Sequence, residues 1–98
     1  MKRSLAHFEA AMRGTLHGGD AAFAGVSTDS RTLQAGELFV ALQGPNFDGH
    51  GFVADAHARG AAGAVVARRV DVPLPQIVVA DTLKALQQAA RVWRDQFA

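Results

Sequence analysis

A hydroxyl-rich run, Ser27-Thr28-Asp29-Ser30-Arg31-Thr32, follows a short apolar segment that is a candidate strand, Phe23 to Val26. Open α/β sheets bind ligands at the carboxyl ends of their strands, so this run is placed to present hydroxyls and backbone amides to a ligand. Arg31 adds planar donors that suit a phosphate. The same side chains could instead satisfy their own backbone in an Asx or Ser/Thr turn. Composition alone favours the turn.

A second polar loop reads Gly44-Pro45-Asn46-Phe47-Asp48-Gly49-His50-Gly51. Its glycines allow a ligand to approach the backbone closely. Asn46 offers a donor and an acceptor to a planar base, and Phe47 offers a ring face. The alternative is a tight connection whose glycines serve geometry only and whose Phe47 packs in the core. Taken alone, this loop does not decide between the two.

Histidines suggest a metal site, but their spacing does not support one. No two of them lie four residues apart on one predicted helix, and no HExxH pattern occurs. We expect no metal site. His50 is interpreted as a hydrogen-bonding loop residue and His57 as a partly exposed helix residue. The residues considered are His7, His17, His50 and His57, with Asp48 and Asp55.

The sequence contains no recognisable catalytic motif. It has no GxxxxGK[ST] phosphate loop, and its only lysines are Lys2 and Lys84. It has no GxGxxG after a strand and no GxSxG motif, and the absence of cysteine excludes a thiolate nucleophile or zinc site. We therefore predict no catalytic residue in this chain.

Apolar periodicity predicts the elements that must position the two loops. Buried strands are indicated by three continuous apolar runs bounded by glycine or proline. Helices are indicated where apolar residues recur every three or four positions. The predicted order is α-β-β-α-β-β-α, a layered α/β sandwich with a small mixed sheet. The strands are Phe23–Val26, Leu38–Leu42, Gly63–Ala67 and Gln76–Ala80; the helices start after Ser4, at Phe52, and after Asp81 or Thr82.

The ends of these helices are also predicted. Ser4 is the expected N-cap of the first helix, with Gly14 just past its end. Gly60 is expected to terminate the second helix. In the last helix an apolar stripe is expected to face the core; it consists of Leu83, Leu86, Ala90, Trp93 and Phe97.

Length and charge limit the class of protein. Ninety-eight residues, 49% of them hydrophobic, make one domain with a real core. A formal net charge of +1 with mixed signs predicts no nucleic-acid surface, and the doublet Arg68–Arg69 is interpreted as a solvated strand end. No apolar run approaches the roughly 20 residues that span a membrane. We expect a cytoplasmic protein without a membrane anchor.

The two loops and the strand between them resemble the Mur ligases, the bacterial cell-wall ligases. The resemblance covers most of the chain from Val26 onward and is most specific in the central third. It looks more like the D-Ala-D-Ala-adding (MurF) type than the tripeptide-forming type. The residues that support it are Val26–Leu33, Gly36–Leu42, Gly44, Phe47–Phe52, Ala56, Arg59-Gly60-Ala61, Val65-Val66 and Val79–Leu83.

The resemblance implies the amino-terminal domain, residues 1–98, of a three-domain ligase that joins D-Ala-D-Ala to UDP-N-acetylmuramoyl-tripeptide. This domain would bind the UDP end of the substrate and hold no cofactor. ATP and Mg²⁺ would belong to the full-length enzyme, whose central ATPase and C-terminal domains this chain lacks. The isolated domain is expected to be inactive. The alternatives are the substrate domain of the tripeptide-forming Mur ligase and a non-enzymatic interaction module of the same fold.

The resemblance also implies which residues contact the substrate. The two loops would form opposite sides of one uridine-diphosphate site, with Thr28 and Ser30 on one side and Pro45-Asn46-Phe47 on the other. Asp29 and Arg31 match the same motif and either touch the ligand or hold the turn. The expected substrate-binding set comprises Thr28, Asp29, Ser30, Arg31, Gly44, Pro45, Asn46, Phe47, Asp48, Gly49 and His50.

Overall fold

A mixed five-stranded sheet forms the middle layer of the computed structural model, which describes residues 3–44 and 47–97. The strands lie in the order β2 (Thr15–His17), β9 (Gln76–Val78), β8 (Gly63–Val66), β5 (Glu37–Val40) and β4 (Gly25–Ser27). The last four run parallel to one another, and β2 pairs antiparallel with β9. The predicted α/β class with a small mixed sheet is confirmed.

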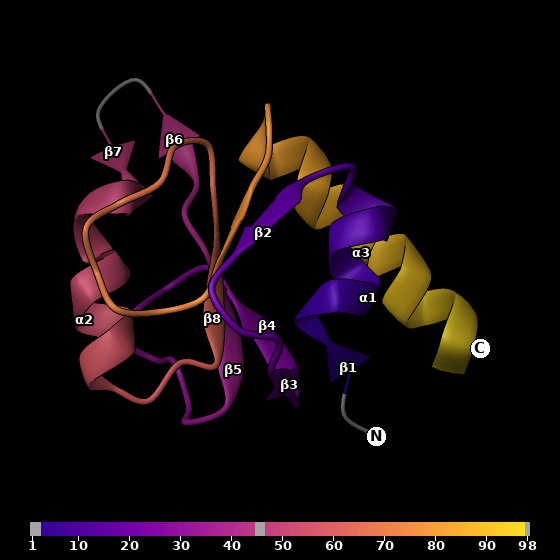
Figure 1. Ribbon diagram of the computed structural model, residues 1–98, viewed down its shortest axis with the longest axis horizontal. Helices are drawn as coiled ribbons and strands as arrows, with labels where there is room; N and C mark the ends of the chain where they lie inside the picture. Colours follow the sequence, from indigo (N-terminus) through magenta and orange to yellow (C-terminus); the bar gives the residue numbers. More distant parts are fainter. Residues whose placement is uncertain (1–2, 45–46, 98) are drawn as a thin grey trace.

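Helices cover both faces of this sheet (Figure 1). On one face α1 (Leu5–Met12) packs against α3 (Thr82–Phe97). The other face carries the 3-10 turn η1 (Gly49–Phe52) and α2 (Val53–Ala58).

Strand β5 shows why both faces are apolar, because its side chains alternate between two cores. Leu38 and Val40 belong to the core beneath α1 and α3, and Phe39 belongs to the core beneath α2. In β8, Val65 faces the first core and Val66 the second. The continuous apolar runs thus predicted strands buried on both faces correctly.

Several short strands were not predicted. The pair β1 (Arg3–Ser4) with β3 (Ala22–Phe23) and the hairpin β6 (Gln43–Gly44) with β7 (Phe47–Asp48) have two residues per strand. The single strand predicted over Phe23–Val26 is therefore divided, because Phe23 belongs to β3 and the main-sheet strand β4 starts at Gly25. Strand β2 lies at a sheet edge and is partly exposed, so it has no continuous apolar run. Strands this short and this exposed leave no hydrophobic pattern in the sequence.

The helix ends agree with the sequence except at one residue. Ser4 Oγ accepts from the His7 amide at 3.2 Å, which confirms the N-cap of α1. Asp81 Oδ1 accepts from the Leu83 amide at 3.0 Å and therefore caps α3. Gly60 follows α2 with φ of +90°, as its predicted terminating role requires. At the end of α1, however, Arg13 adopts the left-handed conformation, with φ of +55°, where a glycine is more usual.

The predicted stripe of α3 is wrong at its first residue. Leu83 is 52% exposed, whereas Thr82 and Ala85 are buried and Leu86 packs against the core. The start of α3 is therefore rotated relative to the predicted stripe. Its other members, Ala90, Trp93 and Phe97, have side chains outside the described set.

Candidate functional site

The carboxyl ends of the parallel strands β4, β5 and β8 lie at one edge of the sheet, as their pairing requires. A cleft of about 590 Å³ opens there on the side of α2. It is lined by residues from the turn after β4, from β5 and its continuation, and from η1: Thr28, Asp29, Ser30, Arg31, Phe39, Leu42 and Phe52. All four residues predicted in the first loop thus contribute to one cleft.

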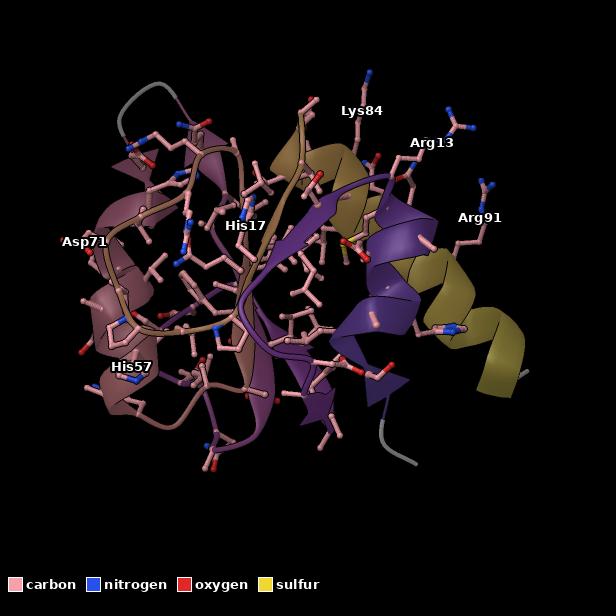
Figure 2. All side chains as sticks on the ribbon, viewed as in Figure 1. Arg13, His17, His57, Asp71, Lys84 and Arg91 are labelled. Atoms are coloured by element: carbon pink, nitrogen blue, oxygen red, sulfur yellow. The ribbon has the colours of Figure 1, made fainter. Side chains whose placement is uncertain are left out.

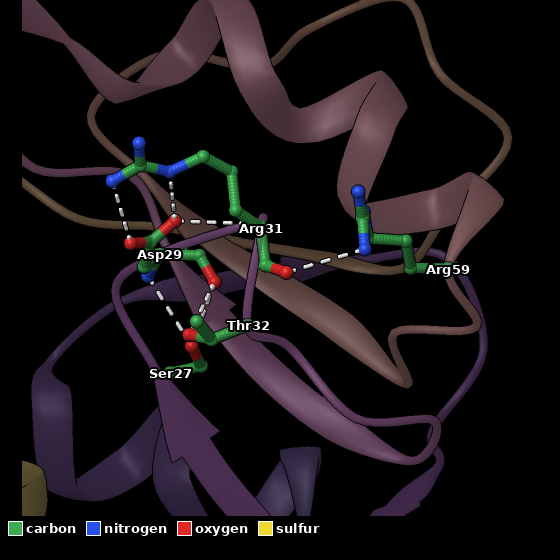
Figure 3. Close-up of polar contacts among 5 residues, drawn as sticks. All are labelled: Ser27, Asp29, Arg31, Thr32 and Arg59. Atoms are coloured by element: carbon green, nitrogen blue, oxygen red, sulfur yellow. Dashed lines mark hydrogen bonds and ion pairs between the residues drawn. The ribbon is translucent and has the colours of Figure 1, made fainter.

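The turn after β4 is held together by its own side chains (Figure 3). Ser27 Oγ donates to the Asp29 carbonyl at 3.0 Å and accepts from the Asp29 amide at 3.2 Å. Asp29 Oδ1 accepts from the Arg31 amide at 2.9 Å. Thr32 Oγ1 donates to the Asp29 carbonyl at 3.5 Å. The Ser/Thr and Asx turn that composition favoured is therefore present, and it is built by these three side chains.

Asp29 and Arg31 form a two-pronged ion pair beside the cleft. Arg31 Nε donates to Asp29 Oδ1 at 3.1 Å, and Nη2 donates to Oδ2 at 3.0 Å. These hydrogen bonds, together with the one from the Arg31 amide, lower the pKa of the Asp29 carboxyl. The hydrogen bond to Asp29 likewise raises the pKa of Arg31. Both groups stay charged at neutral pH, and the guanidinium is held in one orientation although the side chain is 83% exposed.

Arg59, at the end of α2, joins this turn to the helix. Its Nη1 donates to the Arg31 carbonyl at 3.3 Å (Figure 3). Its Nε contacts Asp55 Oδ2 at 3.5 Å. The contact with Arg31 connects residues 28 positions apart in the chain. No local sequence pattern indicates this contact, because the two residues meet only through the fold.

Thr28 and Ser30 differ from their neighbours in the turn. Among the residues that the structure describes, neither hydroxyl has a hydrogen-bond partner, and both line the cleft. Ser30 is 4% exposed. A buried hydroxyl without a protein partner pays the free-energy cost of desolvation with no compensating hydrogen bond. Such a hydroxyl is therefore well placed to bind a polar ligand atom.

The remaining cleft wall is apolar and consists of Phe39, Leu42 and Phe52. Sequence reasoning assigned Phe39 and Leu42 to a buried strand and Phe52 to the start of a helix, and it did not place them at the site. In the sequence, the one indication that these residues belong to the site is their position beside the two polar loops. The cleft therefore combines an apolar wall with hydroxyls and a guanidinium, which suits an amphipathic ligand.

The second predicted loop is a hairpin followed by η1. Gly44 pairs with Phe47, and Gln43 pairs with Asp48. Pro45 and Asn46 lie outside the described residues. Of this loop, the described residues Asp48, Gly49 and His50 do not line the cleft, although Leu42 before them and Phe52 after them do. The side chain of Phe47 lies outside the described set.

Asp48 and His50 are bonded within the protein. Asp48 Oδ1 lies 2.7 Å from His50 Nδ1, and Asp48 Oδ2 accepts from Arg68 at 2.9 Å. The hydrogen bond from the His50 amide, followed by that from Arg68, lowers the pKa of the Asp48 carboxyl well below its ordinary range. His50 is a hydrogen-bonding loop residue, as predicted. Arg68 lies just past the end of β8 and is exposed, as expected of a solvated strand end, and it also pairs with Asp48.

The other histidines lie apart from this cluster. His17 is on β2 and His57 is exposed on α2 (Figure 2). In the described part of the chain, no group of three or more potential metal ligands comes together. Across the same residues, no helix has both the length and the apolar character needed to span a membrane.

A protein-family model described as "Mur ligase family, catalytic domain" matches residues 22–94. The chain belongs to the Mur ligase family. The family resemblance of the central motifs is thereby confirmed, and the match runs well beyond them.

Ligases of two types within the family are similar to this chain. The UDP-N-acetylmuramoyl-tripeptide–D-alanyl-D-alanine ligase of Escherichia coli K12 is 44% identical over 85 residues, 87% of this chain and 19% of that protein. A UDP-N-acetylmuramoyl-L-alanyl-D-glutamate–2,6-diaminopimelate ligase of Aquifex aeolicus is 44% identical over 66 residues, 67% of this chain and 14% of that protein.

Solved structures of the same family share the fold. A MurF crystal structure from Acinetobacter baumannii superposes with a TM-score of 0.88 at 35% identity, covering 98% of this chain and 22% of that one. MurF from Thermotoga maritima, solved in complex with ADP, gives a TM-score of 0.60 at 30% identity, covering 67% and 16%. The chain thus spans about a fifth of the length of its curated Escherichia coli relative.

Proposed function

We propose that this Mur ligase chain is the amino-terminal domain, residues 1–98, that binds the UDP-N-acetylmuramoyl end of a peptidoglycan precursor. The larger enzyme would add D-Ala-D-Ala to UDP-N-acetylmuramoyl-tripeptide. The observation that supports this most directly is the cleft at the strand ends, whose lining includes the buried Ser30 with a hydroxyl that has no partner among the described residues. The D-alanyl-D-alanine type is supported by the extent of the match, because the Escherichia coli ligase matches 87% of the chain and the equally identical Aquifex aeolicus ligase matches 67%.

The cleft has groups suited to each part of a uridine diphosphate. The wall of Phe39, Leu42 and Phe52 suits a flat nucleobase, and the Thr28 and Ser30 hydroxyls suit ribose or phosphate oxygens. Arg31 uses Nε and Nη2 for Asp29, so Nη1 remains for a phosphate oxygen. On this proposal Asp29 acts by holding Arg31.

The chemistry of ligation would lie in the rest of the enzyme. The chain has no phosphate-loop motif, so it is expected to hold no cofactor and to hydrolyse no ATP by itself. ATP and Mg²⁺ would bind a central domain of the larger enzyme, and the Thermotoga maritima relative, solved in complex with ADP, supports the use of ATP by the family. The partners of this domain would then be the UDP-linked tripeptide and the two further domains of the same polypeptide, in the cytoplasm.

A titration of the ¹⁵N-labelled chain with UDP-N-acetylmuramoyl-tripeptide tests binding. We expect amide signals of Thr28–Arg31 to shift, and UDP alone to shift the same signals, because the cleft takes the nucleotide end. The matched control is N-acetylmuramoyl-tripeptide without the nucleotide, which should leave them in place. Absence of any shift at millimolar UDP ligand would contradict the proposal and favour an interaction module of the same fold. The affinity is expected to be modest, because contacts to other domains are lost.

The diaminopimelate-adding type is the second candidate, favoured by the comparable identity to the Aquifex aeolicus ligase. Both candidates share the UDP-sugar end of the substrate, so this domain alone does not separate them. Phosphate release by the full-length polypeptide does. We expect ATP-dependent release with UDP-linked tripeptide and D-Ala-D-Ala, and none with UDP-linked dipeptide and diaminopimelate. The opposite pattern would establish the second candidate.

A further inference from the structure

His50 is a buried histidine whose two ring nitrogens are both engaged. Its side chain is 1% exposed. Nε2 lies 2.8 Å from the backbone nitrogen of Ala67, and Nδ1 lies 2.7 Å from Asp48 Oδ1. An amide N–H can only donate, so Nε2 must be the unprotonated acceptor. The ring is then neutral, and its single proton is on Nδ1, where it is donated to Asp48.

These bonds join two separate parts of the chain. Asp48 ends the β6–β7 hairpin, and Ala67 directly follows strand β8, 17 residues beyond His50. A second tether, the ion pair between Arg68 and Asp48, is about half exposed on both sides. Exposed pairs contribute little, whereas a buried donor that loses its partner costs its full desolvation energy. The imidazole is therefore the stronger of the two tethers.

The tethered hairpin lies between two residues of the cleft, Leu42 before it and Phe52 after it. Its base is closely packed, because the Gly49 amide donates to the Leu42 carbonyl at 2.7 Å. A Cβ atom at Gly49 would lie 2.8 Å from the same carbonyl oxygen. A shift of the hairpin relative to β8 would consequently move both ends of the apolar cleft wall.

We propose that His50 is a positioning residue of the nucleotide site: its neutral imidazole fixes the β6–β7 hairpin to the end of β8 and so sets the cleft wall that the ligand contacts. The inference rests on the proposed function, because it requires a ligand in the cleft. It assigns His50 a role through Leu42 and Phe52 and no contact with the substrate.

Two substitutions at this position separate the two hydrogen bonds. In His50→Gln the amide oxygen reaches the place of Nε2 and can accept from Ala67, which keeps the tether to β8. In His50→Asn the shorter amide reaches only the place of Nδ1, which keeps the bond to Asp48 and leaves the Ala67 amide unpaired. We expect His50→Gln to bind UDP within about threefold of the wild type, and His50→Asn to bind about tenfold more weakly.

The outcomes are distinguishable in one set of ¹⁵N titrations with UDP. No response from the wild-type chain contradicts the proposed function itself. Equal affinity of folded wild type and His50→Asn overturns only the positioning role, and so does a loss of binding by folded His50→Gln. Circular dichroism establishes that each variant is folded.

One measurement needs no variant, and it applies even where His50→Asn does not fold. Long-range ¹H–¹⁵N correlation of the wild-type imidazole at neutral pH is expected to show the Nδ1–H tautomer for His50. An Nε2–H tautomer or a charged ring would overturn the inference. The exposed His57 serves as the internal reference for a ring without such constraints.

Discussion

Chemically similar neighbours have different roles in the turn after β4. The Ser27 hydroxyl is bonded twice to the backbone of Asp29, whereas the Ser30 hydroxyl has no partner among the described residues and lines the cleft. The choice between turn and ligand site, which composition left open, is therefore not exclusive. Ser27, Asp29 and Thr32 build the turn, and the proposed function assigns the hydroxyls of Thr28 and Ser30 to the ligand.

This division of roles predicts that one serine substitution affects stability and the other affects ligand binding. Ser27→Ala should lower the free energy of unfolding by about 0.5–1.5 kcal/mol, because it leaves the Asp29 amide without its acceptor. Ser30→Ala should leave that energy almost unchanged, since no protein bond is lost, and weaken UDP binding about tenfold. Urea unfolding and NMR titration of both variants measure these effects. A stability loss in Ser30→Ala equal to that of Ser27→Ala would contradict the assignment.

At the level of elements, α1 is joined to the sheet through a very close contact at Gly14. A Cβ atom there would lie 2.6 Å from Ile77 Cγ2 and 2.9 Å from the Val78 carbonyl oxygen. The neighbouring atoms belong to β9, in the sheet, where they have little freedom to move. The glycine is therefore required by space, while the left-handed turn beside it is taken by Arg13.

Gly14→Ala should consequently lower the free energy of unfolding by about 1–3 kcal/mol through overpacking. Gly19→Ala is the matched control, because a Cβ atom at Gly19 meets nothing within 4 Å. It should change the stability by less than about 0.5 kcal/mol. Denaturant unfolding of both variants provides the comparison. Equal effects of the two substitutions would show that the contact with β9 is unimportant.

Elements with a strong local pattern were predictable, and those formed by long-range contact were not. Leu38–Leu42 and Gly63–Ala67 are apolar throughout, and they form β5 and β8 with small differences at their ends. Thr15–His17 becomes β2 only because β9 lies beside it. In the same way, the sequence indicated both loops of the site, but the wall of Phe39, Leu42 and Phe52 depends on how η1 folds back over the sheet.

At the level of the whole molecule, Asp48 connects the hairpin, η1 and the end of β8 in one place. It accepts from the His50 amide at 3.0 Å, contacts the His50 ring and pairs with Arg68. These bonds lower the pKa of its carboxyl from the ordinary value of 3.8. A lowered folded-state pKa means that the unfolded chain binds the proton more readily.

The contribution of the Asp48 carboxylate to the free energy of unfolding depends on pH. The contribution of Asp48 is fully present above pH 3.8 and is lost as the pH falls below that value toward its folded-state pKa. Asp48→Asn should therefore be less stable than the wild type at neutral pH, and the difference should narrow as the pH is lowered from about 4 to about 2. Urea unfolding midpoints across this range provide the test. A difference that stays constant with pH would exclude a role for the ionised carboxylate.

Strand β4 ends the five-stranded sheet, and its turn forms one side of the cleft. Among the described residues, no further strand of that sheet closes this side, so the cleft is open at the edge of the sheet. A ligand longer than the cleft can bind there by one end while the rest of it extends past the sheet. On the proposed function, an open cleft of this kind allows the carrier group of a substrate to be held in one place while the opposite end of the same molecule is altered elsewhere.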